Sequence, residues 1–234
     1  MYGLRGIITI MNYQKEIDYL QSKDAKLSTI MSHELDMIHA DHDIYGALMS
    51  AIISQQISTA AARSIKKRFL EYFKKVTDKD EVYNYPDIET VLNTSIETFK
   101  SLGLSNSKAN YIKNVASFYK DYKLTSLNSP AHKEENVNRE LATYSDTELI
   151  ANLTIIKGVG RWTVEMMLIF KLAREDVFAL DDLALVNGVV SLYNLKRTKT
   201  LKKRIDKISK NWSPYRSIVS RYVWSYKDRD KLKV

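Results

Sequence analysis

Gly158 and Gly160, separated by a single valine, form the tightest glycine pair in this sequence of 234 residues. Only seven glycines occur in the whole chain, so two of them at this spacing indicate a local requirement of the backbone. Glycine lacks a Cβ atom, which lets the chain turn sharply with φ > 0 and lets another backbone come close. Backbone N–H groups presented at such a turn can bind an anion, and a phosphate above all.

Helical patterns flank the glycine pair on both sides. Before it, Ser145 and Glu148 have the spacing of a capping box that opens a short helix. After it, apolar residues recur with the period of a helical face, at Val164, Leu168 and Leu172. The sequence therefore predicts a helix–hairpin–helix element over residues 145–172. The second helix would begin with N–H groups that have no intrahelical acceptor, which suits a nucleic-acid backbone.

Two adjacent carboxylates, Asp181 and Asp182, follow the hairpin and precede a predicted helix from about Leu183 to Tyr193. Aspartate at such a position commonly accepts a hydrogen bond as the N-cap of the helix. A carboxylate held in a low-dielectric cleft can also stabilise a developing positive charge or deprotonate water. The pattern alone leaves both interpretations open.

Basic residues outnumber acidic ones by 36 to 28, which gives a formal net charge of +8. The excess is densest in residues 196–210, where eight lysines and arginines accompany one acid, Asp206. A basic balance favours a polyanionic partner without identifying it, and many basic proteins are simply rich in lysine. Hydrophobic residues make up 44% and charged residues 27%, so we expect a globular rather than a disordered chain.

Cysteine is absent, which excludes disulfides, cysteine-held iron–sulfur clusters and cysteine nucleophiles. Histidines and aspartates mingle in residues 33–43, but solvated helix ends explain them better than a metal site because no His-Glu-x-x-His spacing occurs. No apolar run approaches the ~20 residues that span a bilayer, and the N-terminus does not resemble a signal peptide. We therefore expect an intracellular protein of the cytoplasm or nucleoid.

No strand pattern of any length occurs, and the hydrophobic periodicity predicts an all-α fold. The first helix is expected over residues 12–40, and the next two over residues 44–54 and 59–74. Residues 125–143 are the least patterned and are expected to form a loop. Gln55 and Gln56 stand at the junction of two predicted helices, where they form either a polar loop or a wedge that enters a DNA stack.

The sequence resembles the helix-hairpin-helix, Gly-Val-Asp (HhH-GPD) superfamily of DNA glycosylases at Ile156-Lys-Gly-Val-Gly-Arg-Trp-Thr163 and at Phe178-Ala-Leu-Asp-Asp182. The similarity is greatest to the 3-methyladenine DNA glycosylase II branch. Further stretches agree in the family's order, namely Ile53-Ser-Gln-Gln-Ile-Ser58, Leu102-Gly-Leu-Ser105 with Lys108-Ala109, and Trp212-Ser-Pro-Tyr-Arg-Ser217 with Trp224. A lone Gly-x-Gly is a weak signal, whereas these matches in order, over residues 44–226, are specific.

The resemblance implies two helical subdomains that flank a cleft, with the helix-hairpin-helix element at its rim. One subdomain would comprise residues 44–174, and the other would combine residues 1–43 with residues 175–234. The implied partner is double-stranded DNA that contains a damaged base, and we expect a monomer.

The resemblance assigns the chemistry to Asp182, which lies 20 residues after Trp162, as in the branch. Its carboxylate would stabilise the oxocarbenium-like sugar that forms when the N-glycosidic bond of a flipped nucleotide breaks. Asp181 would cap the following helix or make a supporting contact. Trp162 occupies the position at which bifunctional relatives hold a lysine nucleophile, so no Schiff base and no AP lyase activity are expected.

The implied base pocket consists of side chains that match pocket positions of the branch: Trp162, Met166, Tyr215 and Trp224. Electron-rich rings attract the positively charged alkylated purines, such as 3-methyladenine, by roughly 0.5 to 2 kcal/mol. Met166 stands where the branch often has a tyrosine, and this difference affects which bases the pocket would prefer. The aromatic residues would alternatively be core anchors, and for Trp212 the core is the expectation.

The resemblance also places contacts to the DNA backbone at the hairpin, at Lys157, Gly158, Gly160, Arg161 and Thr163. Gln56 matches the wedge that fills the space left by the flipped nucleotide. A monovalent cation, sodium or potassium, would be held by the carbonyls of Thr154, Ile156 and Val159. Catalysis itself is expected to need no cofactor and no iron–sulfur cluster.

The sequence thus predicts a monofunctional DNA glycosylase that excises alkylated purines of the 3-methyladenine or 7-methylguanine type in base excision repair. One alternative keeps the fold and changes the lesion to hypoxanthine, ethenoadenine or uracil. Another is a DNA-binding module that uses the hairpin without catalysis, since such elements often only hold phosphates. The placement of Asp182 and the aromatic cluster favour the enzyme, because a phosphate binder needs neither.

Overall fold

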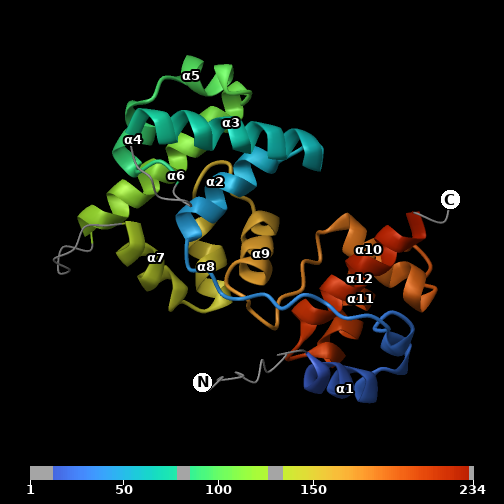
Figure 1. Ribbon diagram of the computed structural model, residues 1–234. Helices are drawn as coiled ribbons and strands as arrows, with labels where there is room; N and C mark the ends of the chain where they lie inside the picture. The colour runs from blue at the N-terminus through green and yellow to red at the C-terminus, as the bar shows by residue number, and fades with distance from the viewer. Residues whose placement is uncertain (1–12, 78–84, 126–133, 232–234) are drawn as a thin grey trace, which may run out of the picture. The chain divides into compact units, whose positions relative to one another are not determined.

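A computed structural model of the chain describes residues 13–77, 85–125 and 134–231 (Figure 1). Helices are the regular secondary structure of these residues, with no strand among them, so the predicted all-α class is confirmed. The chain divides into two compact units, which we call the hairpin unit, Ala40–Ala173, and the terminal unit, Met1–His39 with Arg174–Val234. The sequence-based boundaries fell at 43/44 and 174/175.

The hairpin unit contains eight α-helices among its described residues: α2 (Ile44–Ser54), α3 (Thr59–Thr77), α4 (Ile88–Asn93), α5 (Ile96–Ser101), α6 (Asn106–Thr125), α7 (Glu134–Ala142), α8 (Asp146–Leu153) and α9 (Arg161–Phe170). Helix α2 packs against α3, α6, α7 and α9. It is apolar around most of its circumference, as expected for a helix enclosed by others.

Buried aromatic rings and one buried amide hold the hairpin unit together. Tyr45 and Tyr119 meet edge to face, with ring centroids 5.0 Å apart. Asn138 of α7 accepts hydrogen bonds at its Oδ1 from the backbone N–H of Tyr45, at 3.1 Å, and from the hydroxyl of Tyr119, at 2.8 Å. A buried amide with its acceptor satisfied twice fixes the register of α2, α6 and α7.

The terminal unit combines both ends of the chain: α1 (Gln14–Lys23), the 3₁₀ helix η1 (Ala25–Thr29), α10 (Leu183–Tyr193), α11 (Leu201–Ser209), the 3₁₀ helix η2 (Lys210–Trp212) and α12 (Arg216–Lys231). Helix α10 packs against both α11 and α12. Trp212 is fully buried, and its indole Nε1 donates to Asp24 Oδ2 at 3.2 Å. The expectation that Trp212 anchors the core is thereby confirmed.

Two sequence-based expectations about elements are wrong. The helix expected over residues 12–40 ends at Lys23, because Asp24 adopts an extended backbone and its side chain accepts from Lys26 N at 3.1 Å. Residues 31–43, between η1 and α2, form no helix, and the hydroxyl of Tyr222 in α12 donates to His33 O at 2.9 Å.

The loop expected over residues 125–143 contains helix α7, whose face of Val137, Asn138 and Leu141 is buried against its neighbours. Residues 126–133 lie outside the described part. Within the described stretches, no helix combines the length and the apolar character that a bilayer crossing demands. The described residues also hold no group of three or more acidic or histidine side chains arranged for a metal ion.

Candidate functional site

Helices α8 and α9, with the turn between them, form the predicted helix–hairpin–helix. The capping box that opens α8 is present, since Glu148 N donates to Ser145 Oγ at 3.3 Å and Ser145 N donates to Glu148 Oε2 at 2.8 Å. Hydrogen bonding of its side chain to Ser145 lowers the pKa of Glu148. In the turn, Val159 N donates to Ile156 O at 2.9 Å, which folds the chain back toward α9.

The two hairpin glycines serve different purposes. Gly158 has φ = +105°, and a Cβ placed on it would lie 2.2 Å from Cγ of Tyr111. It is therefore required by both backbone conformation and close packing. Gly160 has φ = −90° and is the N-cap of α9, and a Cβ there would meet no heavy atom within 4 Å. The open space at Gly160 leaves the first turn of α9 accessible to a ligand.

Three side chains of the hairpin unit hold the backbone of the hairpin and of the end of α2 by hydrogen bonds that no local sequence pattern predicts. Gln55 Nε2 donates to Gly158 O at 3.0 Å, and Asn114 Nδ2 donates to Lys157 O at 3.0 Å. Lys108 Nζ donates to Ile53 O at 2.8 Å near the end of α2, and burial lowers the pKa of this lysine. Only the tertiary structure brings these residues together, because each bond joins positions more than 40 residues apart.

Gln56, the predicted wedge, lies at the tip of the turn between α2 and α3. Its side chain is exposed, and its backbone has φ = +55°, in the left-handed region that non-glycine residues rarely adopt. The neighbouring Gln55 ties this turn to Gly158. Local strain at an exposed amide, held in place by surrounding bonds, is typical of a functional position.

The residues predicted to contact phosphate differ in accessibility. Lys157 is exposed. Arg161 donates through Nε to Glu165 Oε1 at 2.8 Å, yet its side chain is 63% exposed, so further guanidinium N–H groups face solvent. Thr163, in contrast, is buried at 4% exposure, so its hydroxyl cannot reach a DNA phosphate in this conformation. The Thr163 hydroxyl therefore does not share the accessibility of Lys157 and Arg161.

The three carbonyls predicted to hold a monovalent cation belong to the segment from the end of α8 to the hairpin turn. Thr154 is the C-cap of α8, and Ile156 O already accepts from Val159 N at 2.9 Å. A carbonyl oxygen has two lone pairs, so this bond leaves Ile156 one further site. Neutral carbonyl oxygens are the ligands that replace the hydration shell of a monovalent ion. The donor set fits such a cation.

Asp182, in the terminal unit, is the N-cap of α10, and its Oδ1 accepts from Leu185 N at 2.6 Å. The same oxygen accepts from Nε1 of Trp224 at 2.9 Å. The two donors, one from α10 and one from α12, fix the orientation of the carboxylate. Of the two roles expected for Asp181, capping or a supporting contact, the structure shows the second, since Asp182 caps the helix and Asp181 forms an ion pair with Lys202.

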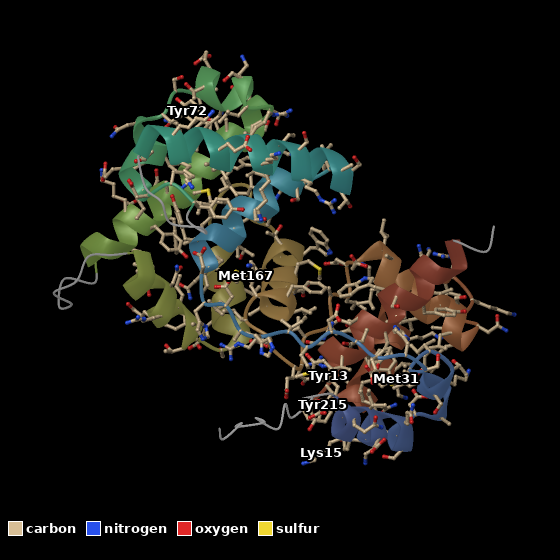
Figure 2. The ribbon with its side chains drawn as sticks, in the orientation of Figure 1. Tyr13, Lys15, Met31, Tyr72, Met167 and Tyr215 are labelled. Atoms are coloured by element: carbon tan, nitrogen blue, oxygen red, sulfur yellow. The ribbon has the colours of Figure 1, made fainter. Side chains whose placement is uncertain are left out.

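The predicted pocket residues are distributed between the two units. Trp162 and Met166 lie one helical turn apart on α9, where Trp162 is 44% exposed and Met166 is half-buried. Trp224 directs its indole N–H at Asp182, as described above. Tyr215, labelled in Figure 2, precedes α12 and meets the ring of Tyr19 edge to face, with centroids 5.5 Å apart. Each unit thus contributes part of the predicted set.

Comparison with known proteins defines the class first. Residues 49–214 match the HhH-GPD superfamily base excision DNA repair protein family, and the chain belongs to that superfamily. Within it, the chain falls in the 3-methyladenine DNA glycosylase branch that its motifs indicated. The all-α fold with a helix-hairpin-helix is shared with solved structures of this branch.

Two curated relatives come from Schizosaccharomyces pombe. The alkylbase DNA glycosidase-like protein mag2 is 32% identical over 216 residues, which cover 91% of this chain and 93% of mag2. DNA-3-methyladenine glycosylase 1 is 33% identical over 180 residues, 77% of this chain and 71% of that protein. The solved structure of the 3-methyladenine DNA glycosylase Mag1 of the same organism, in complex with abasic DNA, matches with a TM-score of 0.69 and 29% identity, covering 90% of this chain and 95% of Mag1.

Proposed function

We propose that this protein excises alkylated purines from double-stranded DNA by hydrolysing the N-glycosidic bond, and leaves an abasic site. The function class is that of its branch, alkylbase DNA glycosylases of base excision repair. The observation that carries the proposal is the Asp182 carboxylate, which two N–H donors hold at the start of α10, at the family's spacing from the hairpin.

The chemistry follows from a carboxylate with a fixed orientation. A stacked nucleotide is unreachable, so the damaged nucleotide leaves the duplex first. As the bond between C1′ and the base nitrogen lengthens, its electron pair goes to the cationic base, which departs neutral, and positive charge develops on the sugar. Asp182 stabilises that charge, and water adds its oxygen to C1′ while its proton passes to the carboxylate or to solvent.

The product is an abasic site with an intact sugar–phosphate backbone. Trp162 stands where a bifunctional glycosylase has its lysine nucleophile, and an indole cannot form a Schiff base with the sugar aldehyde. Borohydride trapping tests this part of the proposal. We expect no covalent adduct between protein and DNA, and a trapped adduct would overturn the assignment as a monofunctional enzyme.

The hairpin unit binds the backbone of the damaged strand. The N-terminal turn of α9, open at Gly160, binds a phosphate through backbone N–H groups, with the exposed Lys157 and Arg161 beside it. A monovalent cation on the carbonyls of Thr154, Ile156 and Val159 would add positive charge at the same phosphate. Gln56 fills the space that the flipped nucleotide vacates, and Trp162 offers a ring to the cationic base.

The decisive experiment measures free bases released from duplex DNA that contains methylated purines, by wild type and by Asp182→Asn. Asparagine caps helices about as well as aspartate, so this variant keeps the cap of α10 and removes only the charge. We expect the rate to fall by about 10²- to 10³-fold, the usual loss when one group that stabilises a charged transition state is removed.

Asp181→Asn is the matched control, because it removes the adjacent charge and breaks the ion pair with Lys202. It should retain most of the activity. If the wild-type protein binds DNA but releases no base, the enzyme assignment is wrong and the protein is a DNA-binding module. An Asp182→Asn protein with the full rate would show that the carboxylate serves only as a cap.

A further inference from the structure

The net positive charge is concentrated in the terminal unit. The hairpin unit has 17 lysines and arginines against 16 acidic residues, whereas the terminal unit has 19 against 12. Residues 196–210 alone hold eight basic residues and one acid. The unit with the phosphate-binding hairpin is therefore almost neutral, and the main electrostatic attraction for a polyanion resides elsewhere.

Helix α11 arranges these charges on one face. Its apolar side packs into the unit, with Ile205 fully buried and Leu201 and Ile208 half-buried. The opposite side is solvent-exposed and carries Lys202, Lys203, Arg204 and Lys207. Figure 1 shows α11 in the same bundle as α10 and α12. The exposed face continues into the preceding segment, where Lys196, Arg197 and Lys199 are exposed as well.

Internal pairing accounts for only part of this charge. Lys210 pairs with Asp206 at 2.9 Å, and Lys202 pairs with Asp181. Arg197 donates to the Asn187 side chain at 2.7 Å. The described part of the chain offers no acidic partner to Lys199, Lys203 or Lys207. Lysines that form no internal ion pair can neutralise phosphates, and the DNA then releases the counterions condensed on it.

The basic face is also directly linked to the carboxylate assigned to catalysis. Lys202 of α11 holds Asp181, and Asp181 precedes Asp182 in the chain. Because α10 and α11 pack together within one unit, the positions of the unpaired lysines relative to Asp182 are set by the fold. A strand bound at these lysines would be placed with respect to Asp182 without help from the hairpin.

We propose that residues 196–210 form a second surface for the DNA backbone, separate from the hairpin, with Lys199, Lys203 and Lys207 as its phosphate contacts. The identity of the polyanion as duplex DNA rests on the function proposed above. The surface binds phosphates without regard to sequence, as expected for lysines that contact no base. It supplies the larger part of the salt-dependent affinity.

The test compares two triple variants in binding to a lesion-free DNA duplex at several salt concentrations. The first is Lys199→Gln, Lys203→Gln and Lys207→Gln, and the control is Lys15→Gln, Lys23→Gln and Lys100→Gln, which changes the same charge at other exposed positions. Each lost phosphate contact flattens the slope of log K against log salt by about 0.9. We expect flattening by about 2 to 3 for the first variant and by less than about 0.5 for the control.

A first variant with the wild-type slope, or one that flattens no more than the control, overturns the proposal. Loss of affinity for duplex RNA without loss for duplex DNA overturns it as well. The outcome is separable from that of the proposed function, because binding to lesion-free DNA needs no excision. If excision occurs, Asp182→Asn should lose the rate and keep the wild-type salt slope, so a failure of the proposed excision and a failure of the basic surface give different results.

Discussion

The hairpin unit and the terminal unit differ in net charge and in the features that distinguish their predicted site residues. The hairpin unit is almost neutral and relies on backbone geometry, with a glycine at φ = +105° packed on Tyr111 and a left-handed Gln56 at a turn tip. The terminal unit carries nearly all of the net charge and holds one carboxylate between two donors. On the proposed function, the hairpin unit would position the DNA strand by its shape, whereas the terminal unit would supply attraction and chemistry through its charge.

The largest effect should come from the glycines of the hairpin. Gly158→Ala forces a Cβ to within 2.2 Å of the Tyr111 ring at a positive φ, so we expect a loss of about 3 kcal/mol in the free energy of unfolding. Gly160→Ala meets open space and should change it by less than about 0.5 kcal/mol. The midpoints of urea unfolding, compared at a constant m value, measure the change in the free energy of unfolding for both variants. Equal losses would show that the two glycines are equivalent after all.

The next effect concerns the indole that positions Asp182. Trp224→Phe keeps an aromatic ring and removes the N–H that donates to Oδ1 at 2.9 Å. A hydrogen bond to a charged group contributes about 1.5–3 kcal/mol, so we expect the rate at saturating DNA to fall by about 10- to 100-fold.

Trp212→Phe is the matched control, because Trp212 donates to Asp24 Oδ2 at 3.2 Å in the core of the same unit. It should reduce stability and leave the rate of the folded protein unchanged. If Trp224→Phe reduces only stability, its indole serves the fold and does not position the carboxylate.

A smaller effect is expected for the ion pair between Asp176 and Arg216, the first residue of α12. Burial would raise the pKa of Asp176, but hydrogen bonds from Arg216, at 2.7 Å, and from Ser213 outweigh burial and lower the pKa below its ordinary value of 3.8. A lowered folded-state pKa means that the stabilisation is present above the unfolded-state value and is lost as pH falls through the folded-state value.

Asp176→Asn should therefore destabilise the protein by about 1–2 kcal/mol near neutral pH. The difference from wild type should shrink as the pH is lowered below about 4, because the wild-type carboxylate becomes protonated. Urea unfolding of both proteins at a series of pH values gives the comparison. A difference that stays constant down to about pH 2 would mean that the charge of Asp176 contributes nothing.

A small change in stability is expected at Gln56. Gln56→Gly relieves the left-handed strain, of order 1 kcal/mol, while the added freedom of the unfolded chain offsets part of that gain. Gln56→Ala keeps the strain. Both variants lose the amide, so base release from a duplex should slow, and release from single-stranded DNA should slow less. A wedge role is wrong if duplex and single-stranded substrates respond equally.

Much of the fold could be predicted because local signals agreed with it. Helix α2 covers the expected residues 44–54, and α10 covers the expected 183–193, since compact apolar periodicity and a capping aspartate mark both. The capping box of Ser145 and Glu148 formed as predicted. The helix expected through residue 40 ends at Lys23, where Asp24 adopts an extended backbone, and the segment beyond is contacted by a residue far along the chain, the Tyr222 hydroxyl at His33 O.

For the candidate site, too, sequence patterns predict the local features and miss the long-range contacts. The residue types of the hairpin and the Asp181–Asp182 pair could be found from spacing. The bond from Trp224 to Asp182 joins residues 42 positions apart, and that from Gln55 to Gly158 joins residues 103 apart, so no local pattern encodes either. The sequence also presented Gly158 and Gly160 as equivalent, whereas only the packing of Tyr111 separates their roles.

The division of labour between the units is tested most directly by one variant in each, Asp182→Asn and Gly160→Ala, assayed on the same methylated duplex. The measurement is the base-release rate at saturating DNA together with the Kd. We predict that Asp182→Asn loses at least about 10²-fold in rate with a Kd near that of wild type. Gly160→Ala should keep the rate and weaken the Kd by about tenfold, or 1.4 kcal/mol. If both variants lose rate, or both lose only affinity, the assignment of chemistry to one unit and of phosphate binding to the other is contradicted.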